Sequence, residues 1–225
     1  MARYKLVTFD VYAALFDLEG SMVPEVRAAL PPADVDPLAF FRLWRTKQLE
    51  FALISNSLGR GHLKFHYLTE QALNYALKRF GVDLPAETRA RLVAAWNRLR
   101  PWPEAGQVLA GVKDRGCLTA LLSNGDEAML RELAKQLPVG VDYIFAADQA
   151  GFYKPHPAIY ELPLKTLGLD RSEVLHVAGS ASDVMGARSF GLPCAWSNRT
   201  RDFVLEPELG PDFEFSDLTG VLGLL

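Results

Sequence analysis

Short apolar runs, each followed by small or polar residues, recur along the chain and predict the strands of one sheet. Their residues include the β-branched and aromatic types that strands favour. Because the runs lie far apart in the sequence, the sheet must assemble from distant segments. The runs are residues 4–9, 118–122, 174–177 and 193–197.

Helical stretches separate the later runs. Residues 126–136 and 157–167 lie between the second and third runs, and residues 183–190 lie between the third and fourth. Alternation of strand and helix is typical of right-handed βαβ units, whose strands are parallel. The predicted fold class is therefore α/β, with a doubly wound, mainly parallel, Rossmann-like sheet.

The region 17–97 interrupts this alternation, because it contains no convincing strand and has the pattern of several successive helices. Segments 36–57 and 69–80 carry apolar residues at largely helical spacing. We expect these helices to pack as an inserted, all-helical cap domain. The apolar positions of the first segment are Leu38, Phe41, Leu49, Leu53 and Ile54.

The boundaries of the insertion follow from length and from proline. The 225 residues suit one large α/β domain, or a core domain with a smaller inserted one. Pro101 and Pro103 mark the return to the core and indicate a stiff hinge. The predicted domains are a catalytic core of residues 1–16 and 98–225 and a cap of residues 17–97.

Composition is that of an ordinary globular protein, with 49% apolar and 23% charged residues. The formal charge is -3 and the basic residues are scattered, so we expect neither a nucleic-acid nor a membrane partner. The apolar run 6–9 is too short for a signal peptide or a membrane span. Cys117 and Cys194 lie in apolar surroundings, which predicts buried thiols and a cytoplasmic protein.

Polar side chains that follow the predicted strands are the candidates for chemistry, because ligands bind beyond the carboxyl ends of strands in an open α/β sheet. They are Asp10, Ser123, Asn124 and Asp183, together with Lys154 from a loop. Each has a structural interpretation when taken singly, as a helix cap, a turn residue or a solvated lysine. Together they supply a nucleophile, hydrogen-bond donors, a cation and a second carboxylate, which one active site could combine.

These residues fall in four motifs in a fixed order. The motifs are FDVYAALFD at 9–17, LSNG at 122–125, KP at 154–155 and DVMGAR at 183–188. In these motifs the sequence resembles the haloacid dehalogenase superfamily, and the similarity runs over essentially the whole chain. The resemblance implies the α/β fold with a cap and an aspartate nucleophile, Asp10.

Most members of that superfamily are phosphatases, which hold magnesium with an acidic residue two positions after the nucleophile and another in the fourth motif. Here position 12 is Tyr12, and the stretch 178–182 before Asp183 has hydroxyls but no carboxylate. Because Mg²⁺ prefers carboxylate and phosphate oxygens, the replacements argue against metal-dependent phosphoryl transfer, and we expect no metal and no cofactor. The four histidines lack metal-site spacing and are interpreted as structural, with only His156 expected near the pocket.

A tyrosine at position 12 makes the chain similar to the L-2-haloacid dehalogenase branch, which uses no metal. Arg45 matches the arginine that this branch provides for the leaving halide. Tyr160 matches a tyrosine six residues after the motif lysine. Leu49 and Phe65 match apolar walls of the substrate pocket, although core packing is the simpler explanation for either residue taken alone.

The resemblance implies hydrolytic dehalogenation of a small 2-haloalkanoic acid. Asp10 would displace the halide and form a covalent aspartyl ester with inversion, while Arg45 would stabilise the departing halide. Lys154 would keep Asp10 ionised, and Asp183 would orient or deprotonate the water that cleaves the ester. The predicted substrate-binding residues are Tyr12, Ser123, Asn124, Leu49, Phe65, Tyr160 and Ser180.

Departures from the family pattern leave two alternatives open. Ala13 and Ala14 stand where the family has Gly-Thr, which removes a hydroxyl beside the nucleophile. Ala178 and Ser180 stand where the family tends to have Ser and Asn, which shortens the reach toward water. The alternatives are a phosphatase with re-sited magnesium ligands and a vestigial protein of the same fold that binds small carboxylates. The sequence also leaves open the natural substrate, its halide, and whether the chain forms a homodimer.

Overall fold

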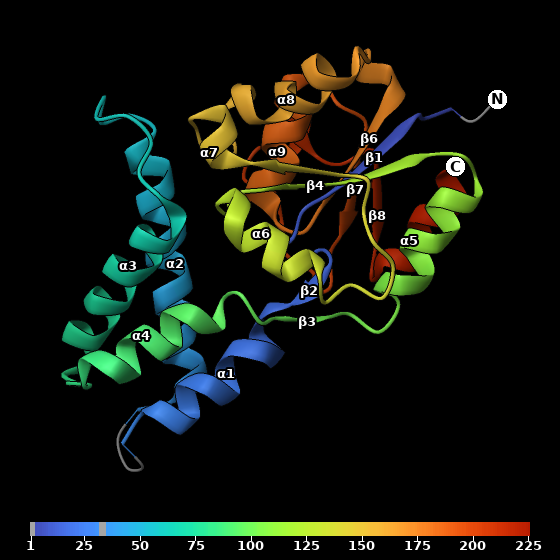
Figure 1. Ribbon diagram of the computed structural model, residues 1–225. Helices are drawn as coiled ribbons and strands as arrows, with labels where there is room; N and C mark the ends of the chain where they lie inside the picture. The colour runs from blue at the N-terminus through green and yellow to red at the C-terminus, as the bar shows by residue number, and fades with distance from the viewer. Residues whose placement is uncertain (1–2, 32–34) are drawn as a thin grey trace.

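A six-stranded sheet forms the centre of the computed structural model, which describes residues 3–31 and 35–225 (Figure 1). The strand order is β5-β4-β1-β6-β7-β8, and each neighbouring pair is parallel. The predicted α/β class with a doubly wound parallel sheet is confirmed. The strands are β1 (Leu6–Phe9), β4 (Leu118–Ser123), β5 (Tyr143–Ala146), β6 (Val174–Ala178), β7 (Cys194–Ser197) and β8 (Phe213–Phe215).

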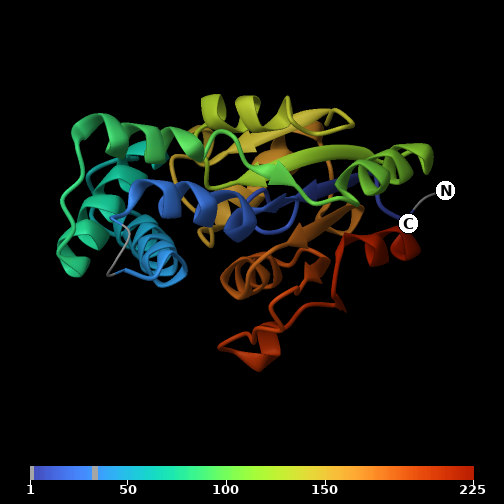
Figure 2. The same cartoon turned by 90° about the horizontal axis from the view of Figure 1, so that it is seen from below.

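Helices cover both faces of the sheet (Figures 1 and 2). From β1 the chain winds outward through β4 to β5, then returns through β6 and β7 to β8. Because parallel crossovers are right-handed, the helices of the two directions lie on opposite faces. One layer has α5 (Ala105–Asp114) and α6 (Glu127–Ala134), the other has α8 (Pro157–Leu167) and α9 (Ala181–Phe190), and α7 (Ala147–Ala150), η1 (Arg171–Glu173), η2 (Pro207–Leu209) and η3 (Leu218–Leu224) are short.

The strands that the sequence did not predict lie at the two edges of the sheet. β5 contains partly buried residues and β8 contains an exposed one, whereas every residue of β1 and β6 is buried. In β8 the exposed Glu214 interrupts the apolar residues, as expected for an edge strand. β5 is apolar throughout but only four residues long, and so short a run does not distinguish a strand from a helix segment. The helix α5 was also missed, although it carries the crossover into β4.

The insertion consists of four helices that lie to one side of the sheet, at the left of Figure 1. It begins and ends at two short strands that pair antiparallel, with Phe16 opposite Pro101. The prediction that region 17–97 contains no strand is therefore wrong at its first residue, because Asp17 belongs to β2. The elements are β2 (Phe16–Asp17), α1 (Leu18–Ala29), α2 (Pro37–Ser55), α3 (Phe65–Phe80), α4 (Ala86–Ala95) and β3 (Arg100–Pro101).

The buried face of α2 differs from the predicted one. Leu53 and Ile54 are 45% and 46% exposed, although their spacing suggested burial. The buried positions of this helix include polar Gln48, because its side chain hydrogen-bonds within the insertion instead of reaching water. The spacing of apolar residues alone therefore predicted a buried face of α2 that is rotated by part of a helical turn from the observed one. The buried residues are Phe40, Phe41, Trp44, Gln48, Ala52 and Ser55.

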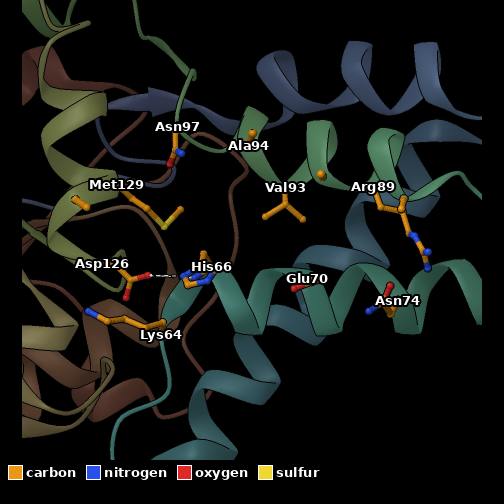
Figure 3. Close-up of a pocket in the computed structure, with 13 residues that line it drawn as sticks. Lys64, His66, Glu70, Asn74, Arg89, Val93, Ala94, Asn97, Asp126 and Met129 are labelled. Carbon is orange, nitrogen blue, oxygen red and sulfur yellow. Dashed lines mark hydrogen bonds and ion pairs between the residues drawn. The ribbon is translucent and has the colours of Figure 1, made fainter.

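The helix α3 receives its N-terminal cap from the core. Lys64, at the cap position, makes no capping hydrogen bond with its side chain. Instead Asp126, just before α6, accepts from the backbone N–H of Phe65 at 2.9 Å and of His66 at 3.2 Å, and Figure 3 shows it facing His66. The first N–H groups of a helix lack partners within the helix. Core and insertion are thus hydrogen-bonded at this point.

Two features expected from composition can be compared with the structure. Cys117 and Cys194 are free and buried, and burial raises the pKa of the Cys194 thiol well above its usual value. Across the described parts of the chain, no helix combines the length and apolar character that crossing a bilayer needs.

Candidate active site

Three neighbouring strands, β4, β1 and β6, bring their carboxyl ends together and define the site. Asp10 directly follows β1, Asn124 follows β4, and Asp183 lies in the first turn of α9 after β6. Lys154 comes from the loop that precedes α8. The sequence placed Asp10 and Asn124 at strand ends and Asp183 just downstream of one, and the sheet order makes those ends adjacent.

A buried lysine joins the two carboxylates. Nζ of Lys154 lies 3.2 Å from Oδ1 of Asp10 and 2.8 Å from Oδ2 of Asp183. The backbone N–H of Lys154 donates to Oδ1 of Asn124 at 2.7 Å, which fixes the loop that carries the lysine. The side chains of Lys154 and Asp10 are only 5% and 10% exposed. Charges this far from water need such paired and hydrogen-bonded surroundings.

Burial and charge shift the pKa values of these three groups in different ways. Burial raises the pKa of Asp10, and the Lys154 charge opposes that rise only in part. Burial lowers the pKa of Lys154, but Asp10 and Asp183 outweigh it, so the net direction is upward. Burial also raises the pKa of Asp183, but His176 and Lys154 outweigh it and hold that pKa well below its usual value. Asp183 and Lys154 are therefore firmly ionised, while Asp10 depends on Lys154 for its charge.

Asp183 is held by two further side chains. Tyr160 donates its hydroxyl to Oδ1 at 2.8 Å, and Nε2 of His176 lies 3.0 Å from Oδ2. His176 in turn lies 2.9 Å, through Nδ1, from the hydroxyl of Thr8. The sequence pattern predicted a structural role for His176 and only His156 near the pocket. A polar residue inside an otherwise apolar strand was the signal that could have found it.

The side chain of His156 contacts its own segment of the chain. Its Nδ1 accepts the backbone N–H of Ala158 at 3.2 Å, so the side chain caps α8. Its ring stacks on that of Phe152, with centroids 3.8 Å apart. His156 is not among the residues that line the cavity at Asp10.

A small cavity of about 30 Å³ lies at Asp10. Most predicted site residues line it, and Leu53 and Ser182 line it without having been predicted. Three predicted substrate-binding residues, Ser123, Phe65 and Tyr160, are fully buried behind this lining. Phe65 stacks on the ring of Tyr12 with centroids 5.5 Å apart, and therefore supports a wall of the cavity. The predicted residues that line the cavity are Asp10, Tyr12, Arg45, Leu49, Asn124, Lys154, Ser180 and Asp183.

Arg45 extends from α2 over two aromatic rings. Its guanidinium carbon lies 5.4 Å from the ring centroid of Tyr12 and 5.5 Å from that of Trp96. Nη1 donates to Oε1 of Gln48 at 2.5 Å, and Nε2 of Gln48 donates to the hydroxyl of Thr69 at 2.5 Å. Burial lowers the pKa of Arg45, partly opposed by Asp10. Gln48 was not predicted, although it lies three residues from Arg45 on the same helix face.

The loop after Asp10 is tightly enclosed. Ala13 has φ of 94°, in the left-handed region that favours glycine. A Cβ on Gly179 would lie 2.4 Å from the backbone nitrogen of Ala14 and 3.1 Å from Oδ2 of Asp10. The hydroxyl of Tyr12 is buried, has no hydrogen-bond partner among the described residues, and lies against Gly125. Tyr12 therefore presents its ring, not its hydroxyl, to the cavity.

A larger groove of about 700 Å³ lies away from this cluster, between α3, α4 and α6 (Figure 3). Its lining includes Lys64, His66, Arg89 and Met129, and it contains none of the predicted site residues. Within residues 3–31 and 35–225, no three His, Cys, Asp or Glu side chains come together as metal ligands. The chemistry of the molecule therefore points to the smaller cavity at Asp10.

The sheet, the helical insertion and the carboxylate–lysine–carboxylate cluster together define an α/β enzyme with a buried aspartate at the end of its first strand. A model of the haloacid dehalogenase-like hydrolases matches residues 4–191. The chain belongs to this family.

Relatives cover the chain from end to end. It is 37% identical over 226 residues to an (S)-2-haloacid dehalogenase of Pseudomonas sp. (strain YL), across 100% of this chain and 95% of that one. It is 32% identical to haloacetate dehalogenase H-2 of Moraxella sp. (strain B), across 100% and 99%. The L-2-haloacid dehalogenase of Xanthobacter autotrophicus, solved with chloropropionic acid covalently bound, superimposes with a TM-score of 0.84 at 29% identity, covering 98% of each chain.

Proposed function

We propose that this protein hydrolyses a short (S)-2-haloalkanoic acid to the 2-hydroxy acid, without a metal. The observation that carries the proposal is the ion pair of Asp10 with Lys154 in a small cavity that Arg45 also lines. The similarity to (S)-2-haloacid dehalogenases over the full chain supports it. In this proposal residues 1–16 and 98–225 are the catalytic core and residues 17–97 are the cap.

The first half of the reaction uses Asp10 as the nucleophile. One carboxylate oxygen bonds to C2 of the substrate as the carbon–halogen bond breaks, and the halide leaves with the bonding electron pair. Lys154 keeps Asp10 ionised until attack, and Arg45 meets the negative charge that develops on the halide. Leu49 and the ring of Tyr12 exclude water from the reacting carbon. The product of this half is an ester with inverted configuration.

The second half cleaves that ester with water. Water adds to the ester carbonyl, and the bond from this carbon to the substrate oxygen breaks. The hydroxy acid leaves with one proton of the water, and the other is released as the Asp10 carboxylate re-forms. Asp183 lines the same cavity and already accepts three hydrogen bonds from side chains. A carboxylate has about four lone-pair sites, so one acceptor position remains to orient the attacking water.

Metal independence is supported by the groups around Asp10. The ammonium of Lys154 lies between the two carboxylates, and the ring of Tyr12 lies where a further carboxylate would be needed to bind Mg²⁺. Ala13 and Ala14, which stand where the family has Gly-Thr, have no side-chain hydrogen-bond donor.

The test is halide release from (S)-2-chloropropionate and from fluoroacetate in the presence of EDTA, with Asp10→Asn as the matched variant. We expect release by the wild type and none by the variant. One turnover of excess enzyme in H₂¹⁸O then identifies the attacked atom. If the ester forms, the first hydroxy acid carries unlabelled oxygen from Asp10 and the label enters the protein. Label in the first product, or release abolished by EDTA, would contradict the proposal.

A further inference from the structure

We propose that His176, supported by Thr8, is a positioning residue that orients Asp183 for ester cleavage; this inference rests on the function proposed above. His176 does not line the cavity at Asp10 and is fully buried in β6. It acts through Asp183, whose Oδ2 it contacts at 3.0 Å.

The contact is built into the sheet. Thr8 and His176 are register partners on the adjacent parallel strands β1 and β6, so their side chains leave the same face of the sheet. The hydroxyl of Thr8 lies 2.9 Å from Nδ1, and the opposite ring nitrogen lies at Asp183. The ring of Tyr160 packs edge-on against the imidazole, with centroids 5.8 Å apart. The ring therefore has a fixed plane and a polar partner at each nitrogen.

The hydrogen on Nε2 of His176 follows from the partner of this ring nitrogen. An ionised carboxylate only accepts hydrogen bonds, so Nε2 carries the hydrogen and donates to Asp183. The hydroxyl of Thr8, which can donate or accept, lies 2.9 Å from Nδ1. Both buried polar atoms of the imidazole therefore have hydrogen-bond partners.

Lys154 and His176 both donate to Oδ2 of Asp183, and they differ in whether they also contact Asp10. Lys154 is shared between Asp183 and Asp10, with distances of 2.8 and 3.2 Å. Once Asp10 is an ester, it no longer attracts the ammonium as an anion, and Lys154 is free to shift toward Asp183. His176 and Tyr160 contact Asp183 and not Asp10, so they keep its carboxylate in place through both halves of the reaction. Loss of His176 should therefore harm ester cleavage more than ester formation.

The kinetic test compares His176→Phe, which keeps a planar ring and loses the donor, with His176→Gln, which retains an N–H near the place of Nε2. For the Phe variant we expect a rapid first release of halide with (S)-2-chloropropionate, followed by turnover slower by about tenfold or more, the size of one hydrogen bond to a charged group. Intact-protein mass spectrometry should show the ester accumulating on the Phe variant, with Gln restoring most of the turnover. Equal slowing of both halves, or no difference between Phe and Gln, would overturn the proposal.

A second measurement does not depend on turnover. The ¹³C resonance of the Asp183 carboxyl is titrated in the wild type and in His176→Phe. The charged or titratable groups that face this carboxyl are Lys154 before α8, Tyr160 in α8, Asp10 after β1 and Cys194 in β7. Loss of the donor should raise the pKa of Asp183, and an unchanged titration would overturn the positioning role. If the wild type releases no halide at all, the proposed function fails, and this titration still decides whether His176 holds Asp183.

Discussion

Nζ of Lys154 lies 3.2 Å from Oδ1 of Asp10, and both side chains are almost entirely removed from water. Each charge is stable there because the other is present. Removing one member of such a pair leaves an uncompensated buried charge, which costs more than the pair itself contributes. Asp10 and Lys154 are therefore one electrostatic unit, and a change in either should affect both activity and folding.

Replacing the lysine tests that unit. Lys154→Met keeps the length of the side chain and removes its charge, so we expect halide release to fall by at least about 100-fold. The free energy of unfolding should fall by about 3 kcal/mol, measured by urea denaturation. Lys165→Met is the control, because that lysine is 71% exposed on α8 and pairs with Glu161. A Lys154→Met enzyme with wild-type turnover would contradict the assignment.

The pH dependence of kcat/KM should reflect Asp10. Burial raises its pKa, so the carboxyl remains protonated, and unable to attack, at pH values where a free aspartate is ionised. Activity should fall as the pH drops through a value above the about 4 of an ordinary aspartate. The pKa of Lys154 is raised, so its charge should persist to at least about pH 10. An acid limb at or below about 4 is the result that would exclude a raised pKa for Asp10.

The position of the Arg45 guanidinium, and with it the rate of halide release, should depend on Gln48. Gln48→Leu removes the acceptor at 2.5 Å from the guanidinium and also leaves the hydroxyl of Thr69 without its amide donor. We expect kcat for a chlorinated substrate to fall by about tenfold with a smaller change in KM, since the halide charge develops mainly in the transition state. Lys47→Met should leave kcat unchanged, because Lys47 pairs with Glu50 and does not line the cavity. A larger effect on KM than on kcat would place Gln48 in ground-state binding instead.

Backbone strain at Ala13 predicts a stabilising substitution. Its φ of 94° is costly for a residue with a Cβ, so Ala13→Gly should raise the free energy of unfolding by about 1 kcal/mol. The control is Ala94→Gly, at an exposed position of α4, which should lower it by about 0.5–1 kcal/mol. The two variants make the same chemical change, so opposite signs in thermal or urea unfolding would isolate the conformational cause. Equal signs would refute it.

At Gly179 the close approach of two loops predicts that a substitution is harmful, unlike the stabilising change at Ala13. A Cβ there would lie 2.4 Å from the backbone nitrogen of Ala14, so Gly179→Ala must displace the loop that follows Asp10. Since a misplacement of about 1 Å can cost about 100-fold in rate, we expect halide release to fall by that order. Gly140→Ala has open space around its Cβ and should behave like the wild type. Wild-type rates for both would show that the loop position is not critical.

The sequence predicted the centre of this molecule better than its periphery. β1, β4 and β6 are buried on both faces, so each produces an apolar run that is visible without a structure. A polar residue that follows such a run lies at the carboxyl end of a central strand, which is where ligands bind in an open α/β sheet. Asp10 and Asn124 were found for this reason, and the sheet order then placed Asp183 beside them.

Residues that act through a distant partner could not be found in this way. His176 is meaningful only beside Thr8, which is 168 positions away, and Gln48 only beside Thr69. A polar residue on a buried strand or helix face marks both positions, but this pattern does not distinguish them from satisfied polar residues in a core. The edge strand β8 was missed because Glu214 interrupts its apolar residues, and β5 was missed because a four-residue apolar run does not distinguish a strand from a helix segment. Tertiary pairing, and not local pattern, determines both kinds of feature.

The capping of α3 by Asp126 has a consequence for how this enzyme could be rebuilt from parts. The insertion lacks a side chain of its own for that cap, and Phe65, whose backbone is held there, supports the ring of Tyr12. Grafted onto another Rossmann-like core without an aspartate at this place, the four helices would lose two hydrogen bonds and the alignment of an active-site wall. The insertion is therefore not a portable module, and chimeras should exchange it together with the segment that carries Asp126.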